Sequence, residues 1–578
     1  MSTPTLDDAR AALRARFGFD DFRPHQAEAV AAVLTGRDVV ATMPTGAGKS
    51  LLYQLPALCL DGLTLVVSPL IALMKDQVDA LRARGIAAAY VNSSVEAPER
   101  ARRLEAARRG ELDLLYVTPE RFRSPAFRAL EAELPVTRLA VDEAHCISQW
   151  GHDFRPDYSR LGRYRARLAG HRPGPLPTIA LTATATPRVT RDIVAALDLD
   201  DPLVVRTGIE RPNLFLGFHQ VHLAEEKVPH LAARIRRLGG PGIVYSTLIR
   251  DLEDLHDELA RAGIPSLVYH GRLSARERRA MQERFMASSA EDPAVVLATN
   301  AFGMGVDKAD IRFVLHAQVP RTIEAWTQEV GRAGRDGAPS FCETLFFGED
   351  LAVQQEFVRW ANPDRDFVLG VLDTLARWGE RVATKTHEDL VAELLVKNRR
   401  DNRAAISLRW LEVLGAVTGS FETHDLAVDP DFDPADLPAV VGSAEKLDGD
   451  LRGLLAMAEL AGPDLSAGCR RVGLAAHFEL DEPGEPCGTC DLCLAPEAWL
   501  DGRWPTAAAP APAVAAATPA APDDFPFARG DWVRYGRRMG RIVQVAERGR
   551  RLEVTIEDAS SLSRRTIDPR KVPLERLE

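Results

Sequence analysis

The sequence predicts an α/β protein of two tandem lobes, followed by a helical segment, a cysteine-rich segment and a small β-barrel. The chain has 578 residues, too many for one hydrophobic core, so roughly three to five domains are expected. Short apolar runs alternate with amphipathic stretches in two successive sets, which is typical of parallel sheets with helices on both faces. Four of the seven cysteines crowd between Cys469 and Cys493, and the composition changes twice after them.

The composition limits the classes of function. Hydrophobic residues make up 46% and charged residues 27%, which is ordinary for a soluble globular protein. The net charge is −11, so nucleic-acid binding would need a local basic patch. The N-terminal residues hold no apolar core of the signal-peptide type, and no apolar run is long enough to span a bilayer. We expect a cytoplasmic protein with no membrane partner.

The first lobe is predicted over residues 1–208 and the second over 209–348. Within each lobe, apolar runs of strand length are separated by helical stretches. The runs of the first lobe are residues 38–44, 64–70, 112–119, 138–145 and 178–185. The runs of the second lobe are residues 242–247, 266–270, 294–300 and 312–319. Two such lobes in series predict a cleft between them.

Residues 349–445 form a segment of different character. Helical periodicity is found at 367–378, 386–395 and 401–414, and a short strand is predicted at 415–421. Three helices and a strand hairpin fit a winged helix, in which 401–414 would be the recognition helix. A plain helical connector fits equally well, and the sequence leaves both interpretations open.

Three segments complete the chain. Residues 446–500 hold the cysteine cluster, which in a cytosolic chain indicates a metal site rather than disulfides. Residues 501–523 are a low-complexity run of alanine and proline, typical of a semi-extended linker. Residues 524–578 alternate like short strands and predict a small SH3- or Tudor-like β-barrel.

A phosphate-binding loop is predicted between the strand at 38–44 and the helix that follows. Gly46 and Gly48 let backbone N–H groups wrap around phosphate oxygens, and the helix N-terminus adds positive potential. Lys49 would reach the β- and γ-phosphates, Ser50 would hold Mg²⁺, and Thr45 belongs to the same loop. Met43 and Pro44 stand where the strict pattern has its first glycine.

Two carboxylates follow an apolar strand about ninety residues later. Asp142 would bind Mg²⁺, directly or through water, and Glu143 would polarise the attacking water as general base. His145 would link the nucleotide site to the neighbouring lobe. An exposed acidic pair in a loop is the alternative, and the apolar strand directly before both residues disfavours it.

The second lobe is predicted to supply positive charge to the γ-phosphate. Arg332 and Arg335 lie three residues apart, on one face if the segment is helical. Arg335 would be an arginine finger and Arg332 a γ-phosphate contact. Asp307, in the preceding glycine-containing loop, would sense the nucleotide. We expect ATP and Mg²⁺ as cofactors, with ATP closing the cleft and hydrolysis opening it.

These motifs together resemble the superfamily 2 helicases, and two further stretches are similar to the RecQ family of DNA helicases with RecA-like lobes. Residues 17–26 resemble that family's adenine pocket. The resemblance implies that Phe19 stacks on the base, Arg23 contacts the nucleotide and Gln26 reads the Watson–Crick edge. Residues 145–158 resemble its aromatic-rich loop, which couples DNA contact to hydrolysis.

The aromatic-rich loop implies a set of DNA-coupling residues. Trp150, Phe154 and Arg155 offer stacking and cation–π surfaces for unpaired bases, and His152 takes part with Arg155. A hydrophobic core is the alternative for such an aromatic group. The interleaved glycine, histidine, aspartate and proline residues suit a mobile loop better.

The cysteine spacing resembles the family's zinc-binding domain. Cys487, Cys490 and Cys493 are closely spaced, and Cys469 begins a stretch similar to the family's zinc-domain helix. Four thiolates would hold Zn²⁺ tetrahedrally with no open position, so the site would be structural.

The resemblance implies an ATP-dependent 3′-to-5′ DNA helicase of recombination and repair, acting on single-stranded DNA and on tailed or forked duplexes. It also implies possible single-strand-binding or repair proteins as partners, and we expect a monomer. It covers residues 17–348 closely, together with the cysteine segment. About a hundred residues separate the motor from the cysteines, no winged helix is evident after them, and the linker and barrel take its place.

Two other functions are compatible with the same motifs. An RNA helicase or remodelling translocase would share the lobes and the ATP site, although the aromatic-rich loop and the cysteines disfavour it. A nucleic-acid-binding scaffold with a dead ATP site belongs to another class. The intact Lys49, Asp142, Glu143 and Arg335 argue against it.

Overall fold

The structure is a computed structural model. It describes residues 4–148, 155, 157–208, 211–302, 306–394, 396, 401–421, 424–481, 486–504, 527, 531–535, 538–548, 551–558, 564–567, 569 and 574–576. The chain divides into two compact units, residues 1–506 and 507–578. Among the described residues, none of the helices combines the length and the apolar character needed to cross a membrane.

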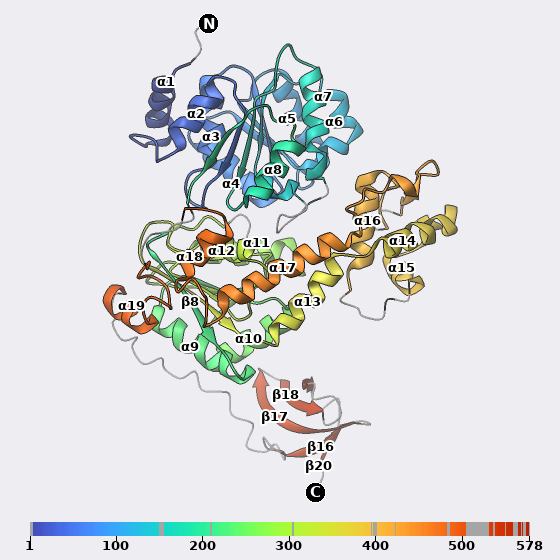
Figure 1. Cartoon of the computed structure of the whole chain (residues 1–578). Helices are drawn as coiled ribbons and strands as arrows, with labels where there is room; N and C mark the ends of the chain where they lie inside the picture. Colours follow the sequence, from blue (N-terminus) through green and yellow to red (C-terminus); the bar gives the residue numbers. More distant parts are fainter. Residues whose placement is uncertain are drawn as a thin grey trace. The chain divides into compact units, whose positions relative to one another are not determined.

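The first lobe is a seven-stranded parallel sheet of order β3-β4-β2-β5-β6-β1-β7 with helices on both faces (Figure 1). Its strands are β1 (Val39–Thr42), β2 (Leu63–Val67), β3 (Ala88–Val91), β4 (Leu114–Val117), β5 (Val136–Val141), β6 (Thr178–Thr182) and β7 (Leu203–Arg206). The five predicted runs are confirmed as β1, β2, β4, β5 and β6. The two edge strands were not predicted: β3 is alanine-rich, and β7 is short and exposes Val204.

Helices pack on this sheet and place its functional loops. They are α1 (Leu6–Ala12), α2 (Gln26–Leu34), α3 (Leu51–Cys59), α4 (Ile71–Ala83), α5 (Ala97–Arg108), α6 (Pro125–Leu130), α7 (Leu161–Gly170) and α8 (Pro187–Ala196). Shorter turns are η1 (Leu13–Phe17), η2 (Pro119–Arg123), η3 (Ala144–Ile147) and η4 (Tyr158–Arg160). Separate hydrophobic clusters lie on the two faces of the sheet. The carboxyl ends of β1 and β5 therefore meet at one edge, where ligands bind in open α/β sheets.

The second lobe is a six-stranded parallel sheet of order β10-β11-β9-β12-β13-β8. Its strands are β8 (Leu214–Gln220), β9 (Gly242–Tyr245), β10 (Leu267–Tyr269), β11 (Val295–Ala298), β12 (Phe313–His316) and β13 (Ser340–Phe346). Its helical elements are η5 (Ala224–Glu226), α9 (Lys227–Leu238), α10 (Ile249–Arg261), α11 (Ala275–Met286) and α12 (Ile323–Val330). The four runs predicted for this lobe are confirmed as β9, β10, β11 and β12.

Two long helices, α13 (Asp350–Ala361) and α17 (Ala444–Ala461), pack side by side beyond the second lobe (Figure 1). The inserted segment between them, residues 365–441, has a hydrophobic cluster of its own. It contains α14 (Arg365–Trp378), η6 (Gly379–Thr384), α15 (His387–Glu393), α16 (Arg403–Leu414), the antiparallel pair β14 (Val417–Thr418) and β15 (Ala427–Val428), and η7 (Pro434–Asp436). The predicted helices and strand are confirmed. Their identity as a winged helix stays a prediction.

The segment predicted as a zinc-binding domain shares the core of the second lobe. Met457, Leu460, Leu474 and Phe478, from α17 and from α18 (Arg470–His477) with its C-cap, join the hydrophobic cluster on one face of the sheet. Trp499, from α19 (Pro496–Arg503), joins the cluster on the other face. The lobe therefore owes part of its core to residues that lie more than a hundred positions beyond its last strand.

The C-terminal unit holds an antiparallel five-stranded sheet of order β19-β18-β17-β16-β20. Its strands are β16 (Trp532–Tyr535), β17 (Arg538–Arg548), β18 (Arg551–Asp558), β19 (Arg564–Ile567) and β20 (Leu574–Arg576). The predicted strands are confirmed. No ladder joins β19 to β20 among the described residues, so closure into a barrel stays a prediction. The predicted linker lies outside them, apart from its first four residues.

Candidate nucleotide-binding site and cysteine centre

A cavity of about 580 Å³ is lined by both lobes of the first unit. Every residue predicted to contact the nucleotide or Mg²⁺ lines it: Phe19, Arg23, Gln26, Thr45, Gly46, Gly48, Lys49, Ser50, Asp142, Glu143, Asp307, Arg332 and Arg335. The parallel sheets explain this convergence, because the loops that follow their strands open at the same edge.

The phosphate loop, residues 43–50, connects β1 to α3. Gly46 and Gly48 have φ values of +85° and +81°, a left-handed backbone region that favours glycine. A Cβ on Gly48 would lie 2.6 Å from Nε2 of Gln26, so a side chain there would displace the amide end of Gln26. The Ala47 N–H donates to the Pro44 carbonyl at 3.1 Å, which closes the loop where the strict pattern has its first glycine.

Lys49 is held against the loop that it follows. Its Nζ donates a hydrogen bond of 2.9 Å to the Met43 carbonyl. Burial lowers the pKa of Lys49, while the carboxylates of Glu143 and Asp142 act in the opposite direction. Ser50 Oγ accepts a hydrogen bond of 3.2 Å from Gln77. The loop thus presents a cation and a hydroxyl oxygen to the same cavity.

The acidic pair begins directly where β5 ends. The Glu143 N–H donates to Oδ1 of Asp142 at 3.0 Å, and Glu143 has a φ of +50°. A side chain in this left-handed region costs about 1–3 kcal/mol, a strain found mostly at functional sites. Burial and the neighbouring Glu143 raise the pKa of Asp142 to about 7. Asp142 and Ser50 line one cavity and offer the oxygen ligands that Mg²⁺ prefers, so these residues fit the metal.

His145 lies inside the first lobe. Its side chain is 1% exposed, and Nδ1 lies 2.9 Å from Thr182 Oγ1 and 3.3 Å from a carboxylate oxygen of Glu143. It therefore connects the ends of β5 and β6. Its predicted link to the neighbouring lobe stays a prediction.

The two arginines of the second lobe stand in a turn. We call residues 331–335, which follow the end of α12, the arginine turn. These residues form a turn and not the helix that the three-residue spacing of the two arginines allowed. Arg335 forms an ion pair with Asp307, and its Cγ would lie 3.6 Å from a Cβ on Gly46. Burial lowers the pKa of Arg335. Within the described part of the chain, Nε of Arg332 and of Arg335 are buried without a hydrogen-bond partner. Both residues line the nucleotide cavity.

Arg211 is a residue that the sequence reasoning missed. Its guanidinium donates to the carbonyls of Ala333 and Gly334 at 2.8 and 2.7 Å, and more weakly to those of Gly331 and Thr45 at 3.3 and 3.5 Å. It thus ties the arginine turn to the phosphate loop of the other lobe. The only signal was its place in the turn-rich stretch between the lobes, residues 208–214.

The residues expected to read the base lie against the phosphate loop. Arg23 donates to the Gly46 carbonyl at 2.5 Å, and Gln26 Nε2 donates to the Ala47 carbonyl at 2.9 Å. Phe19 is 47% exposed at the rim of the cavity. The geometry places all three beside the loop, while their roles toward the base stay predictions.

Half of the aromatic-rich loop lies outside the described residues, including Trp150, His152 and Phe154. Arg155 is described, and its backbone N–H donates to the Cys146 carbonyl at 3.0 Å. The predicted DNA contacts of this loop therefore stay predictions.

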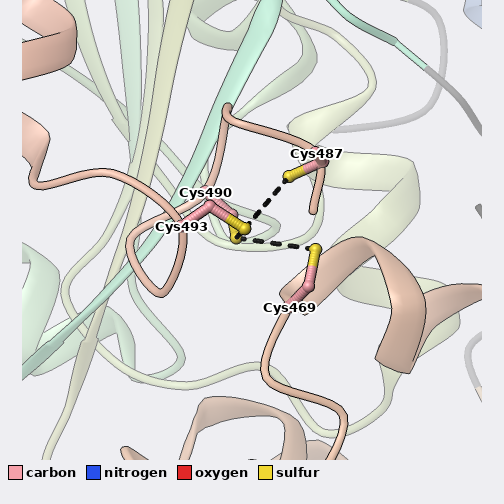
Figure 2. Close-up of side chains that lie close together, drawn as sticks. All are labelled: Cys469, Cys487, Cys490 and Cys493. Carbon is pink, nitrogen blue, oxygen red and sulfur yellow. Dashed lines mark hydrogen bonds between the residues drawn. The ribbon is translucent and has the colours of Figure 1, made fainter. Parts of the chain in front are cut away.

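The cysteine centre consists of Cys469, Cys487, Cys490 and Cys493, whose sulfurs lie within 4.8 Å of one another (Figure 2). Individual Sγ–Sγ distances are 3.4, 3.9 and 4.0 Å. Four thiolates at about 2.3 Å from a tetrahedral Zn²⁺ would stand about 3.8 Å apart, so the set fits this metal. Hydrogen bonds from the Cys490 thiol and the Thr489 N–H lower the pKa of Cys487, which favours the thiolate.

A buried ion pair anchors the cysteine centre on the second lobe. Arg470 is 1% exposed, and its guanidinium contacts both carboxylate oxygens of Asp491 at 2.9 and 2.8 Å. Asp491 also accepts from the Phe218 N–H in β8, while the Leu216 N–H donates to the Thr489 carbonyl. The centre is thus fastened to the edge of the second sheet.

Family models of helicases match one stretch within each lobe. A DEAD/DEAH box helicase model matches residues 23–193, and a helicase conserved C-terminal domain model matches residues 226–337. The probable ATP-dependent DNA helicase RecS of Bacillus subtilis is 40% identical over 367 residues, covering 63% of this chain and 72% of that protein. The ATP-dependent DNA helicase RecQ of the same organism is 43% identical over 352 residues, covering 61% of this chain and 58% of that protein.

A solved structure of the Mycobacterium smegmatis helicase Lhr aligns over 79% of this chain and 61% of its own, with a TM-score of 0.49 and 19% identity. Of the RecQ relatives from Bacillus subtilis and Pasteurella multocida, the chain spans only 58% and 53%.

Proposed function

We propose that this chain, which belongs to the RecQ family of ATP-dependent DNA helicases, hydrolyses ATP between its lobes and uses the resulting motion to travel 3′-to-5′ along DNA and unwind it. The observation that carries this proposal is the shared cavity. Lys49, Asp142 and Glu143 of the first lobe face it together with Arg332 and Arg335 of the second. A phosphoryl-transfer site divided between two lobes is complete only when the lobes are close.

The residues of the cavity divide the work of hydrolysis. Lys49 neutralises the β- and γ-phosphates, and Glu143 orients the attacking water and takes its proton. Arg335 brings charge to the γ-phosphate from the opposite lobe, with Arg332 beside it. Bound Mg²⁺ supplies further charge neutralisation, and Ser50 and Asp142 would hold it. Because Arg335 and Lys49 belong to different lobes, loss of the γ-phosphate removes an attraction that holds the lobes together.

The proposed substrates are single-stranded DNA and tailed or forked duplexes, bound by a monomer in the cytoplasm, with single-strand-binding or repair proteins as partners. The relatives named above are DNA helicases, which supports DNA over RNA. The aromatic-rich loop supports unpaired bases as the contact, since every base presents a face for stacking. The direction of travel rests on the family resemblance.

The proposed role of the cysteine centre is structural zinc binding. All four ligand positions of a tetrahedral Zn²⁺ would be thiolates, so no position remains for a substrate. The centre lies beside the edge strand β8, whereas β12 and β13 separate β8 from β9 and β11 in the sheet. We also propose that the C-terminal sheet closes into a small barrel.

Strand separation tests the function most directly. Partial duplexes with a 3′ or a 5′ tail are mixed with the protein, ATP and Mg²⁺, beside a Lys49→Ala control. We expect unwinding of the 3′-tailed duplex only. If DNA stimulates ATP hydrolysis but no duplex is unwound, the protein is a translocase. If RNA stimulates hydrolysis more strongly than DNA, it is an RNA helicase. If it binds DNA without hydrolysing ATP, it is a scaffold.

A further inference from the structure

The inserted segment meets the first lobe at a charged cluster. Arg123 lies in η2, which follows β4, and its Nη1 donates a hydrogen bond of 2.6 Å to the carboxylate of Glu412 in α16. Its Nε lies 2.9 Å from Oδ1 of Asp157. One guanidinium thus lies between two carboxylates from distant parts of the chain. None of the three residues lines the nucleotide cavity.

Asp157 is the buried member of this cluster. Its side chain is 1% exposed, whereas those of Arg123 and Glu412 are 22% and 41% exposed. Burial raises the pKa of Asp157, and the charges of Arg123 and Arg409 oppose that effect. Among the residues that the structure describes, none forms a hydrogen bond to either carboxylate oxygen of Asp157. Because a buried carboxylate without a cation is strongly destabilising, the placement of Asp157 depends on Arg123.

Asp157 stands directly before a residue that contacts the nucleotide site. Tyr158 is fully buried, and its hydroxyl donates a hydrogen bond of 3.0 Å to the backbone carbonyl of Asp142, the predicted Mg²⁺ ligand. The Tyr158 N–H donates to the carbonyl of Arg155 at 2.9 Å, so the same turn includes a predicted DNA-coupling residue. The end of the aromatic-rich loop is therefore held between Arg123 and Asp142.

Helix α16 carries Glu412 as part of a packed body. It lies against α14, β14 and α13, and Leu411, next to Glu412, is fully buried (Figure 1). At the start of α16, Asn402 lines a cavity formed by the second lobe and α13. Gln354 of α13 donates to the Val319 carbonyl of the second lobe at 2.9 Å. Glu412 is therefore carried by the second lobe, and its contact with Arg123 joins the two lobes.

This contact is separated from the nucleotide site along the first sheet. Arg123 follows β4, whereas the phosphate loop follows β1, and β2, β5 and β6 lie between them in the sheet. The lobes thus meet at the nucleotide cleft and again at Arg123. A change in the distance between the lobes at the second place acts directly on the residue that pairs with Asp157.

We propose that Arg123 is a positioning residue for DNA-stimulated ATP hydrolysis: with Glu412 docked on it, Arg123 holds Asp157 and the end of the aromatic-rich loop in the arrangement in which bound DNA accelerates hydrolysis. The proposal rests on the proposed function and gives the inserted segment a part in the motor without requiring it to bind DNA. When Glu412 separates from Arg123, the guanidinium is held on one side only, so the end of the loop is less firmly fixed and stimulation falls.

Steady-state hydrolysis by the full chain, with and without oligo-dT, tests the role of Arg123. Arg123→Met keeps the aliphatic stem, and the DNA-stimulated kcat should fall about three- to tenfold while the KM for ATP and the rate without DNA stay unchanged. Its melting temperature should also fall, because Asp157 loses its cation. Adding Asp157→Asn removes the unpaired charge, so melting should recover while stimulation stays low. Recovery of both in the double variant would overturn the positioning role.

Glu412→Gln tests the part of the inserted segment and leaves the Arg123–Asp157 pair in place. It should lower the DNA-stimulated kcat about two- to fivefold without changing the melting temperature. Glu388→Gln, on an exposed position of α15 in the same segment, is the matched control and should change nothing. Added to Arg123→Met, Glu412→Gln should have no further effect, since both act through one contact. Full stimulation in Glu412→Gln, or additive losses in the double variant, would overturn the coupling.

The same measurements separate this inference from the proposed function. If DNA does not stimulate hydrolysis by the natural chain, both fail. If the natural chain is stimulated and unwinds a 3′-tailed duplex, and the Arg123 and Glu412 variants behave like it, the inference alone fails.

Discussion

The guanidinium of Arg471 in α18 donates a hydrogen bond of 2.7 Å to the backbone carbonyl of Arg211, the residue that holds the arginine turn. Arg471 also donates to Thr489 Oγ1, next to Cys490 in the cysteine centre. A continuous set of hydrogen bonds therefore leads from the cysteine centre to the turn that presents Arg332 and Arg335 to the nucleotide.

Arg211→Gln should reduce kcat for ATP hydrolysis by about ten- to a hundredfold while changing KM little. The variant removes the donors that fix the arginine turn, and small displacements of a catalytic group have effects of this size. Steady-state kinetics with saturating DNA measures the split between kcat and KM. Arg279→Gln, which removes an exposed arginine paired along its own helix, serves as control. A rise in KM with unchanged kcat would contradict a positioning role.

Lys49→Ala and Glu143→Gln should each abolish unwinding and ATP turnover while DNA binding stays measurable. Lys49 contacts the phosphate loop and Glu143 faces the same cavity, so neither change removes a contact proposed for DNA. Strand separation, phosphate release and anisotropy on the same preparations check the prediction. If either variant lost DNA binding together with hydrolysis, these assignments would be wrong.

Gly48→Ala should weaken ATP binding, because its Cβ would displace the amide end of Gln26, now 2.6 Å away, in the wall of the nucleotide cavity, and its φ of +81° disfavours a side chain. Gly110→Ala is a matched control, since Gly110 has a φ of +71° but a Cβ there would have nothing within 4 Å. The control should lose about 1 kcal/mol of stability and bind ATP normally. Titration with a fluorescent ATP analogue and thermal melting separate the two effects. Equal ATP affinity in both variants would contradict the crowding argument.

Removal of zinc should lower the melting temperature before it affects chemistry. In a closed four-thiolate site, the free energy of metal binding is folding free energy, and here the segment also shares the core of the second lobe. Metal analysis should give one zinc per natural chain and a loss in Cys490→Ser. Cys59→Ser, outside the cluster, should keep both zinc and melting temperature. A Cys490→Ser protein with unchanged melting would disprove a structural role.

Most strands of the two lobes, and the residues that line the nucleotide cavity, could be predicted from the sequence because their signals are local. An apolar strand that leads into Asp142 and Glu143, or into a glycine loop and Lys49, indicates both the structural element and its chemistry. Four strands were not among the predicted runs: the edge strands β3 and β7 of the first sheet, and β8 and β13 of the second. The roles of the individual site residues remain predictions until the variants above are measured.

The other features of the fold and the site could not be predicted, because they depend on contacts between distant parts of the chain. Arg211 acts on backbone carbonyls, which leave no pattern in the sequence. The reach of α16 from Asn402 to Glu412 became visible only once both lobes were placed around it. The sharing of one core by the second lobe and the cysteine segment likewise follows from packing and not from spacing.

That shared core has a consequence for how the protein is made. Phe218 in β8 and its partner Asp491 are 273 positions apart in the chain. At synthesis rates of about 5–20 residues per second, the partner leaves the ribosome roughly 15 to 55 seconds later. Throughout this interval the nascent second lobe carries an open sheet edge, which can pair with strands of other molecules. The rate at which the inserted segment is translated therefore sets how long the nascent chain can aggregate through this open edge.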